Sequence, residues 1–151
     1  MKFSTRTLYG LKAVLVLASR FGEGSLSVSQ IAKKEGISVA YLEQILNALK
    51  KKGLVKSVRG PQGGYVLCKK PSEITLEQLF YSLEDKKFIK PNGNAPTLES
   101  DEVTISNFIF WEKLRQSVEK SLSEVTLKEL MDEARRFKNG KRRNSNHTFH
   151  I

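Results

Sequence analysis

Two helix-start signals, at Ser27 and Ser38, stand so close together that residues 27–52 can form only two short helices with a tight turn between them. A serine at the N-cap accepts a hydrogen bond from a first-turn amide, and a glutamine three residues later closes a capping box. Ser27 with Gln30 fits this pattern, while Ser38 lacks the glutamine but has flanking apolar residues that can staple the helix start. The helices predicted on these grounds span residues 28–35 and 39–52.

A glycine-rich stretch follows the second helix and separates two short strand candidates, residues 54–58 and 65–68. The six residues Arg59-Gly60-Pro61-Gln62-Gly63-Gly64 between them are typical of a hairpin tip. They do not form a nucleotide loop, because they join two strands and lack the Gly-Lys-Ser/Thr ending. Two helices, a tight turn and a hairpin predict a winged helix-turn-helix. The expected fold class is mainly α with a small β-hairpin.

The net charge of +10 is divided unevenly along the chain. Residues 1–70 hold 13 Lys and Arg against 3 Asp and Glu, residues 71–134 hold 7 against 13, and residues 135–151 hold 6 against none. A basic front segment is the electrostatic footprint of a nucleic-acid-binding domain. A charge run alone is more often a solvated face, so the charge supports the helix-turn-helix prediction without proving it.

Further capping and breaker signals extend the map to the whole chain. Additional helices are predicted over residues 5–21, 76–83, 105–122 and 127–137. The expected organisation is a DNA-binding domain over residues 1–84, a loop over 85–102, a helical dimerisation arm over 103–138 and a basic flexible tail over 139–151.

The predicted helix over residues 39–52 is the expected recognition helix. Its apolar residues follow a spacing of 3.6 residues and form one stripe. The opposite face carries amide and small side chains, which can enter a major groove and reach base edges. An ordinary solvated helix face is the alternative interpretation. The helix residues expected to contact DNA are Ser38, Tyr41, Glu43, Gln44, Asn47 and Lys51.

The hairpin tip supplies the remaining expected contacts, Arg59, Gly60 and Pro61. Glycine lets the backbone approach a ligand closely, and arginine is a strong multiple donor. An arginine at a wing tip suits insertion into a narrow minor groove or a phosphate clamp.

The chain contains the motifs Gly36-Ile37-Ser38, Tyr41-Leu42-Glu43-Gln44-Ile45-Leu46, Leu49, Gly53-Leu54-Val55, Val58 to Tyr65, and the opening Tyr9-Gly10-Leu11-Lys12-Ala13. In these motifs it resembles the Rrf2 family of transcriptional regulators, most specifically over residues 36–65. The resemblance covers nearly the whole chain. It implies a homodimer that binds near-palindromic double-stranded promoter DNA, touched by Ser38, Tyr41, Glu43, Gln44, Arg59, Gly60 and Pro61.

The chain departs from part of that family in its cysteines. Members that sense iron, nitric oxide or redox state carry three grouped cysteines after the fourth helix, whereas residues 85–102 contain none here. An iron–sulfur cluster needs several thiolate or imidazole ligands. We therefore expect no cluster and no metal site. The chain resembles the cluster-free branch, which includes cysteine-metabolism repressors of Gram-positive bacteria, and their partner cysteine synthase is a candidate co-regulator.

The one cysteine, Cys68, follows the second strand candidate and precedes Lys69 and Lys70. Nearby cations can lower the pKa of a thiol and make it redox-active, so Cys68 is a candidate redox switch. A small half-buried strand residue is the favoured alternative interpretation.

The predicted helix over residues 105–122 contains four consecutive large apolar residues, 108–111. They cannot all face one partner on a helix with 3.6 residues per turn. One face is expected to pack on the DNA-binding domain and another on a second subunit. A buried core helix, or a ligand pocket at Phe108 and Trp111, is the alternative. The expected dimer contacts are Phe108, Trp111, Leu114, Val118 and Leu122.

These features predict a homodimeric, sequence-specific transcriptional regulator, a repressor of a metabolic or stress regulon. The alternative is a winged-helix module that recruits a protein and has only non-specific DNA affinity. An enzyme is not expected, because no nucleophile–base pair, metal-ligand spacing or phosphate loop is present. No stretch reaches the roughly 18–20 apolar residues of a membrane span, so the expected location is the cytoplasm.

Overall fold

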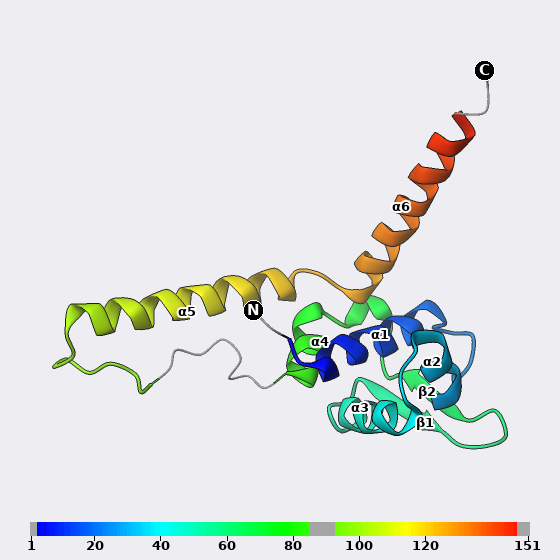
Figure 1. Ribbon diagram of the computed structural model, residues 1–151, viewed down its shortest axis with the longest axis horizontal. Helices are drawn as coiled ribbons and strands as arrows, with labels where there is room; N and C mark the ends of the chain where they lie inside the picture. The colour runs from blue at the N-terminus through cyan, green and yellow to red at the C-terminus, as the bar shows by residue number, and fades with distance from the viewer. Residues whose placement is uncertain (1–2, 85–92, 148–151) are drawn as a thin grey trace.

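The computed structural model describes residues 3–84 and 93–147, with side chains as far as Lys141. Short helices pack beside a two-stranded antiparallel hairpin at the edge of the domain, and two long helices extend away from this domain (Figure 1). The mainly α fold with a small hairpin is therefore confirmed. The elements are α1 (Thr5–Ser19), α2 (Val28–Glu35), α3 (Val39–Lys51), β1 (Val55–Val58), β2 (Gly64–Leu67), the 3-10 turn η1 (Pro71–Glu73), α4 (Leu76–Leu83), α5 (Glu102–Ser123) and α6 (Leu127–His147).

The predicted caps define the helix-turn-helix. The Gln30 amide donates to the Ser27 hydroxyl, and the Gln30 side chain accepts from the Ser27 amide, which completes the capping box of α2. Helix α2 ends at Gly36, whose φ of 65° lies in the left-handed region. Ser38 then caps α3 by accepting from the Tyr41 amide at 3.3 Å. The short turn fixes the direction in which α3 leaves α2.

The core lies between α1, α2, α3, the hairpin and α4. Leu42, Ile45, Leu46 and Leu49 of α3 are all buried to within 1% exposure, as the predicted stripe requires. Val39, the first residue of that stripe, is 43% exposed. Because the stripe faces the core, the other face of α3 lies at the surface.

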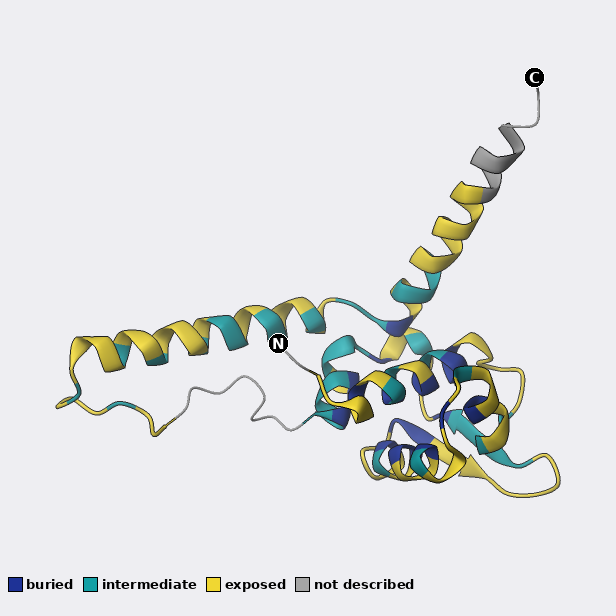
Figure 2. Ribbon diagram, in the orientation of Figure 1, coloured by how far each residue is buried: buried dark blue, intermediate teal, exposed yellow. Residues whose placement is uncertain are grey.

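Helix α5 stands apart from this core. None of its residues, all of which the structure describes, is buried. Figure 2 shows it as an extended arm of exposed and intermediate residues. Phe110 is 60% exposed and Ile109 is 45% exposed. The alternative of a buried core helix is therefore wrong in this chain, because none of the described elements surrounds α5.

The α5–α6 connection returns the chain to the domain. The Leu76 amide donates to the Val125 carbonyl at 2.9 Å, and the Leu127 amide donates to the Ile74 carbonyl at 3.0 Å. The Leu127 side chain is fully buried. These contacts hold the first turn of α6 against η1 and the start of α4.

Helix α6 is longer than the sequence predicts. The predicted helix ends at Phe137 and the flexible tail begins at Asn139, whereas α6 continues to His147. The pair Asn139-Gly140 resembles a helix stop, but a glycine inside a helix costs only about 1 kcal/mol and the flanking lysines and arginines favour helix. The prediction of a flexible tail is therefore wrong for residues 139–147, which are helical. None of the helices in the described ranges is long and apolar enough to cross a membrane.

Other predicted boundaries differ from the observed ones by a few residues. Helix α5 begins at Glu102 rather than at 105, because Asp101 caps it by accepting from the Thr104 amide at 3.0 Å. The predicted loop over 85–102 falls partly on residues 85–92, which lie outside the described ranges. From Gly93 to Asp101 the chain has no helix or strand, as expected for a loop.

Candidate nucleic-acid interface

The exposed face of α3 carries the polar side chains that the sequence singles out. Glu43, Gln44, Asn47 and Lys51 are exposed, and Tyr41 is half-buried. They lie opposite the buried apolar stripe. The face can therefore be approached by a partner without disturbing the core.

A cleft of about 480 Å³ lies along part of this face. The predicted contacts that line it are Tyr41, Gln44, Asn47 and Lys51, joined by Arg6 of α1 and by Lys52. Ser38 and Glu43 do not line the cleft. The Ser38 hydroxyl is engaged at the helix cap, and Glu43 is exposed outside the cleft. The structure thus groups four of the six predicted helix residues.

Besides Lys52, which directly follows α3, Arg6 is the charged residue of the cleft that the sequence prediction missed. It lies in the first turn of α1, and only the packing of α1 on α3 brings it beside the recognition helix. The rings of Tyr9 and Tyr41 meet edge to face with centroids 5.9 Å apart, which links the two helices at this point. Arg6 is one of the basic residues counted in residues 1–70, but that count does not show that Arg6 lies beside the recognition helix.

The wing is anchored to the loop between α1 and α2. Leu26 and Tyr65 exchange two backbone hydrogen bonds, of 3.1 and 2.8 Å. The Ser25 hydroxyl donates to the Gln62 carbonyl at 2.5 Å. A Cβ at Gly64 would lie 2.1 Å from the Leu26 carbonyl oxygen, so only glycine permits this approach. The loop therefore fixes where the wing points.

The tip residues Arg59, Gly60 and Pro61 are all exposed. Gly60 has a φ of 118°, a conformation that favours glycine. At the base of the wing, the Lys50 ammonium donates to the Ser57 hydroxyl at 3.0 Å. This contact connects the end of α3 to β1, so recognition helix and wing are positioned together.

The cations of this surface are not neutralised locally. Lys51, Lys52 and Arg59 form no ion pair with another described residue. Cations of this kind bind phosphates and release counterions from DNA. The surface therefore combines a helix face with amide side chains, a wing with an arginine, and unpaired positive charge.

The sequence profile of the family described as "Rrf2: Iron-dependent Transcriptional regulator" matches residues 3–133. The chain belongs to the Rrf2 family. The resemblance carried by residues 36–65 is thereby confirmed.

Known Rrf2-family proteins resemble this chain over most of its length. It is 38% identical to the HTH-type transcriptional regulator CymR of Bacillus subtilis over 130 residues, which cover 86% of this chain and 89% of CymR. The solved structure of T. potens IscR is similar with a TM-score of 0.71 and 39% identity, covering 89% of this chain and 88% of IscR. The solved structure of CymR, described as the global cysteine regulator of B. subtilis, is similar with a TM-score of 0.71 and 36% identity. The match covers 88% of this chain and 98% of the CymR chain.

The Rrf2 chain presents its single thiol on the surface. Cys68 is exposed and directly follows the last residue of β2, Leu67. The interpretation as a half-buried strand residue is therefore wrong, because the strand ends one residue earlier. The thiol lines a cleft that lies apart from the α3 face. Its redox role stays a prediction.

The residues predicted for the dimer arm are distributed along α5. Phe108, Leu114 and Val118 are half-buried, and Trp111 is 38% exposed. Leu122 lines an apolar cleft of about 150 Å³ with residues of α1, α4 and α6. Leu122 thus faces its own domain. The most exposed member of the apolar run 108–111 is Phe110, which the sequence prediction did not place among the contacts.

Proposed function

We propose that this Rrf2-family protein is a homodimeric, sequence-specific DNA-binding repressor of a metabolic or stress regulon. The observation that supports DNA binding is the open face of α3 beside the anchored wing, with Lys51, Lys52 and Arg59 free of ion pairs to described residues. Helix α3 would enter the major groove, where Gln44 and Asn47 can bond adenine and Glu43 can accept from cytosine. Arg59 would bind the minor groove or a phosphate.

The homodimer is supported by the arm. Helix α5 exposes Ile109, Phe110 and Trp111 together, and large apolar groups gathered on a surface mark an interaction site. A twofold pair of arms would cover these residues and place two copies of α3 on the two halves of a near-palindromic site.

The experiment that tests the function is recovery and sequencing of the genomic fragments that the purified protein retains at physiological salt. The retained promoter fragments are then used to compare the affinities of Arg59→Ala and Arg136→Ala. The Arg136→Ala variant is the control, because it removes an equal charge from an exposed position of α6. Helix α6 extends from the side of the domain away from α3 and the hairpin (Figure 1). We expect Arg59→Ala to weaken binding and Arg136→Ala to leave it unchanged.

A different outcome would favour the second candidate function. Weak binding without sequence preference, equal in both variants, would indicate a winged-helix module that recruits a protein. The unequal charge of the chain favours the DNA regulator, because residues 1–70, which carry α3 and the wing, hold 13 Lys and Arg against 3 Asp and Glu.

The family description names iron, but this chain has few side chains that could hold an iron–sulfur cluster. Cys68 is the one thiol of the whole sequence, and it lies beside two lysines. A cluster needs several thiolate or imidazole ligands, so these donors do not fit one. We propose that this protein regulates without an iron–sulfur cluster. Protein purified without oxygen should be colourless, and a brown protein with acid-labile sulfide would contradict this.

A protein co-regulator is also proposed. The similarity to CymR, described as a global cysteine regulator, makes cysteine synthase the first candidate. Retention of purified cysteine synthase from the same organism on the immobilised protein would support this partner, and its passage without retention would contradict it.

A further inference from the structure

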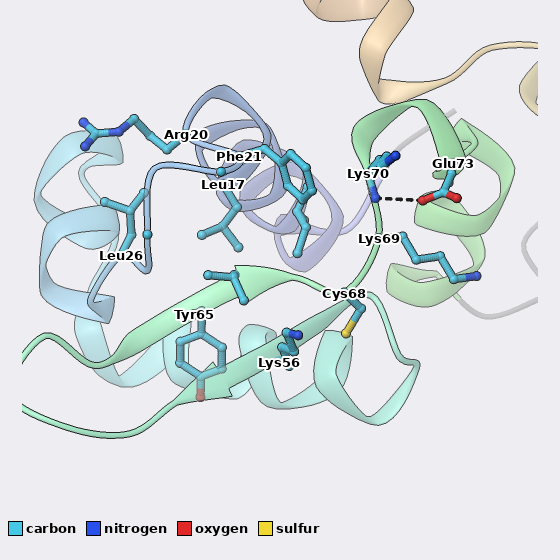
Figure 3. A pocket seen from close by; sticks show the side chains of 14 residues that line it. Leu17, Arg20, Phe21, Leu26, Lys56, Tyr65, Cys68, Lys69, Lys70 and Glu73 are labelled. Carbon is cyan, nitrogen blue, oxygen red and sulfur yellow. Dashed lines mark hydrogen bonds between the residues drawn. The ribbon is translucent and has the colours of Figure 1, made fainter.

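A second cleft, of about 470 Å³, lies behind the wing and is called here the wing cleft. Its walls are the end of α1, the α1–α2 loop, both strands of the hairpin and the segment from Cys68 to Glu73 (Figure 3). Of the described residues that line it, none belongs to α3. The wing cleft is therefore separate from the recognition face but is built on the same wing.

Part of the lining of the wing cleft is apolar and forms the floor of the proposed site. Leu17, Phe21, Leu26 and Val66 contribute to it, and Phe21 remains 44% exposed at the surface. A partly exposed aromatic ring in a concave site offers a flat surface for the apolar body of a ligand. The volume lies within the range of about 300–1,000 Å³ usual for small-molecule sites.

The rim of the wing cleft is cationic. Lys56, Lys69 and Lys70 line it and form no ion pair with another described residue. The carboxylate of Glu73 accepts from the Lys70 backbone amide at 3.0 Å, as the dashed line in Figure 3 shows. Arg20 also lines the rim but pairs with Glu23 at 2.5 Å. Lys56, Lys69 and Lys70 thus border the apolar residues of the cleft, and none of the three pairs with a carboxylate of the described residues.

We propose that the wing cleft binds a small organic anion, with its carboxylate or sulfonate held by the rim lysines and its apolar part on the floor. The arrangement fits an amphipathic ligand better than a bare inorganic ion, because the floor would leave such an ion without partners. The lysines can donate charge-assisted hydrogen bonds to the anionic group.

The anion also weakens promoter binding, a step that rests on the proposed function. It neutralises Lys56 on β1 and Lys69 and Lys70 after β2, and so reduces the positive potential that DNA meets at the wing. The bridge between Leu26 and Tyr65 joins the cleft wall to the wing, so occupancy also acts on the position of the wing. Linkage requires that promoter DNA lower the affinity for the anion by the same factor.

The probe that tests the cleft is 8-anilino-1-naphthalenesulfonate, an aromatic sulfonate whose fluorescence rises in apolar sites. Its dissociation constant is measured for the full chain, for Lys69→Gln/Lys70→Gln and for the matched control Lys33→Gln/Lys34→Gln, which removes two exposed charges from α2. We expect about tenfold weaker binding in the first variant, equal to about 1.4 kcal/mol, and no change in the control. Equal affinities in all three proteins would overturn the proposal.

Cys68 provides a local readout, because the one thiol of the sequence lies in the wing cleft. Probe at a concentration that just saturates the wild-type cleft should slow alkylation of Cys68 by iodoacetamide several-fold in the wild-type protein and clearly less in Lys69→Gln/Lys70→Gln. An unchanged alkylation rate would place the probe elsewhere and overturn the proposal. Far-ultraviolet circular dichroism of each variant confirms that it is folded.

Measuring promoter affinity with and without the probe distinguishes failure of the proposed ligand cleft from failure of the proposed DNA-binding function. Weaker promoter binding in the presence of the probe supports the whole proposal. Protection of Cys68 in a protein that binds no promoter supports the cleft and contradicts the proposed function. Loss of promoter affinity in Lys69→Gln/Lys70→Gln with unchanged probe binding would make the lysines DNA contacts alone and overturn the cleft.

Discussion

The hydroxyl of Tyr81 on α4 donates a hydrogen bond of 2.5 Å to the carboxylate of Glu119 on α5. Arg115 donates to the same carboxylate at 2.6 Å, and it also bonds Glu112. Burial of Tyr81 and its bond to Glu119 raise the pKa of the phenol to about 12. Because α5 buries no side chain fully, this polar cluster helps to hold the arm on the domain, together with the apolar cleft that Leu122 lines.

Replacement of Tyr81 by phenylalanine should therefore loosen the arm. A hydrogen bond to a charged group contributes about 1.5–3 kcal/mol, so we expect Tyr81→Phe to lower the free energy of unfolding by about 2 kcal/mol. Urea denaturation at neutral pH, followed by circular dichroism, measures the loss. The control is Tyr9→Phe, whose half-buried hydroxyl has no hydrogen bond to another described residue. Equal losses in the two variants would contradict the assigned role of the Tyr81 hydroxyl.

The start of α1 should respond to acid through Glu84. Burial acts to raise the pKa of Glu84, but hydrogen bonds from Thr7 and Ser4 outweigh it and lower the pKa. A lowered pKa in the folded state stabilises the protein above the carboxyl pKa of the unfolded chain, and this stability is lost as the pH falls through the folded-state value. Glu84→Gln should thus lower the free energy of unfolding by about 1 kcal/mol at pH 7.

The difference between Glu84→Gln and the wild-type protein should shrink as the pH is lowered below about 4, the region where carboxyl groups take up protons. Urea midpoints measured from pH 7 to pH 3 test this. A difference that stays constant over that range would show that Glu84 acts by packing rather than by its charge.

Gly64→Ala should damage the wing without touching its tip. The new Cβ would lie 2.1 Å from a backbone oxygen of Leu26, which cannot move as a flexible side chain can. We expect a loss of about 2–3 kcal/mol in the free energy of unfolding and weaker promoter binding. The control is Gly140→Ala in α6, where the Cβ meets nothing within 4 Å and should stabilise the helix by up to about 1 kcal/mol. Promoter binding by Gly64→Ala at wild-type strength would show that the Leu26–Tyr65 bridge does not set the wing.

Arg6 and Gln44 line one cleft but should contribute differently to DNA binding. Arg6→Ala should weaken binding to all sequences and reduce the slope of log K against log salt by about 1, because one phosphate contact is lost. Gln44→Ala should leave the slope unchanged and relax the preference for the promoter sequence by about 1–3 kcal/mol. Fluorescence anisotropy with promoter and scrambled duplexes at several salt concentrations measures both. An unchanged slope in Arg6→Ala would remove Arg6 from the interface.

Local signals predicted the helix-turn-helix well, because its caps depend on residues three positions apart. Ser27 with Gln30, and Ser38 with its apolar neighbours, specify helix starts whatever the rest of the chain does. The apolar stripe of α3 follows from helical periodicity alone, and so does the polar face that it leaves open.

Contacts between distant segments could not be predicted in this way. Arg6 reaches the recognition face only because α1 packs on α3, and Gly64 is needed because the Leu26 backbone approaches it. The hydrogen bonds from Ser4 to Glu84 join residues that are 80 positions apart in the sequence. The length of α6 was predicted wrongly for a different reason. Glycine, here Gly140, often ends a helix, but the flanking residues favour helix enough to continue it.

The exposed arm gives the last prediction, which tests the proposed homodimer. Phe110 is 60% exposed on α5, and its ring meets that of Trp111 edge to face with centroids 5.4 Å apart. A charge placed there would have to be buried unpaired in a dimer, at a cost of several kcal/mol. Phe110→Glu should therefore have the mass of a monomer in analytical ultracentrifugation and bind promoter DNA weakly. Leu98→Glu, at a fully exposed loop position, is the control and should remain a dimer. A dimeric Phe110→Glu would move the interface away from this part of α5, and a monomeric wild-type protein would contradict the homodimer itself.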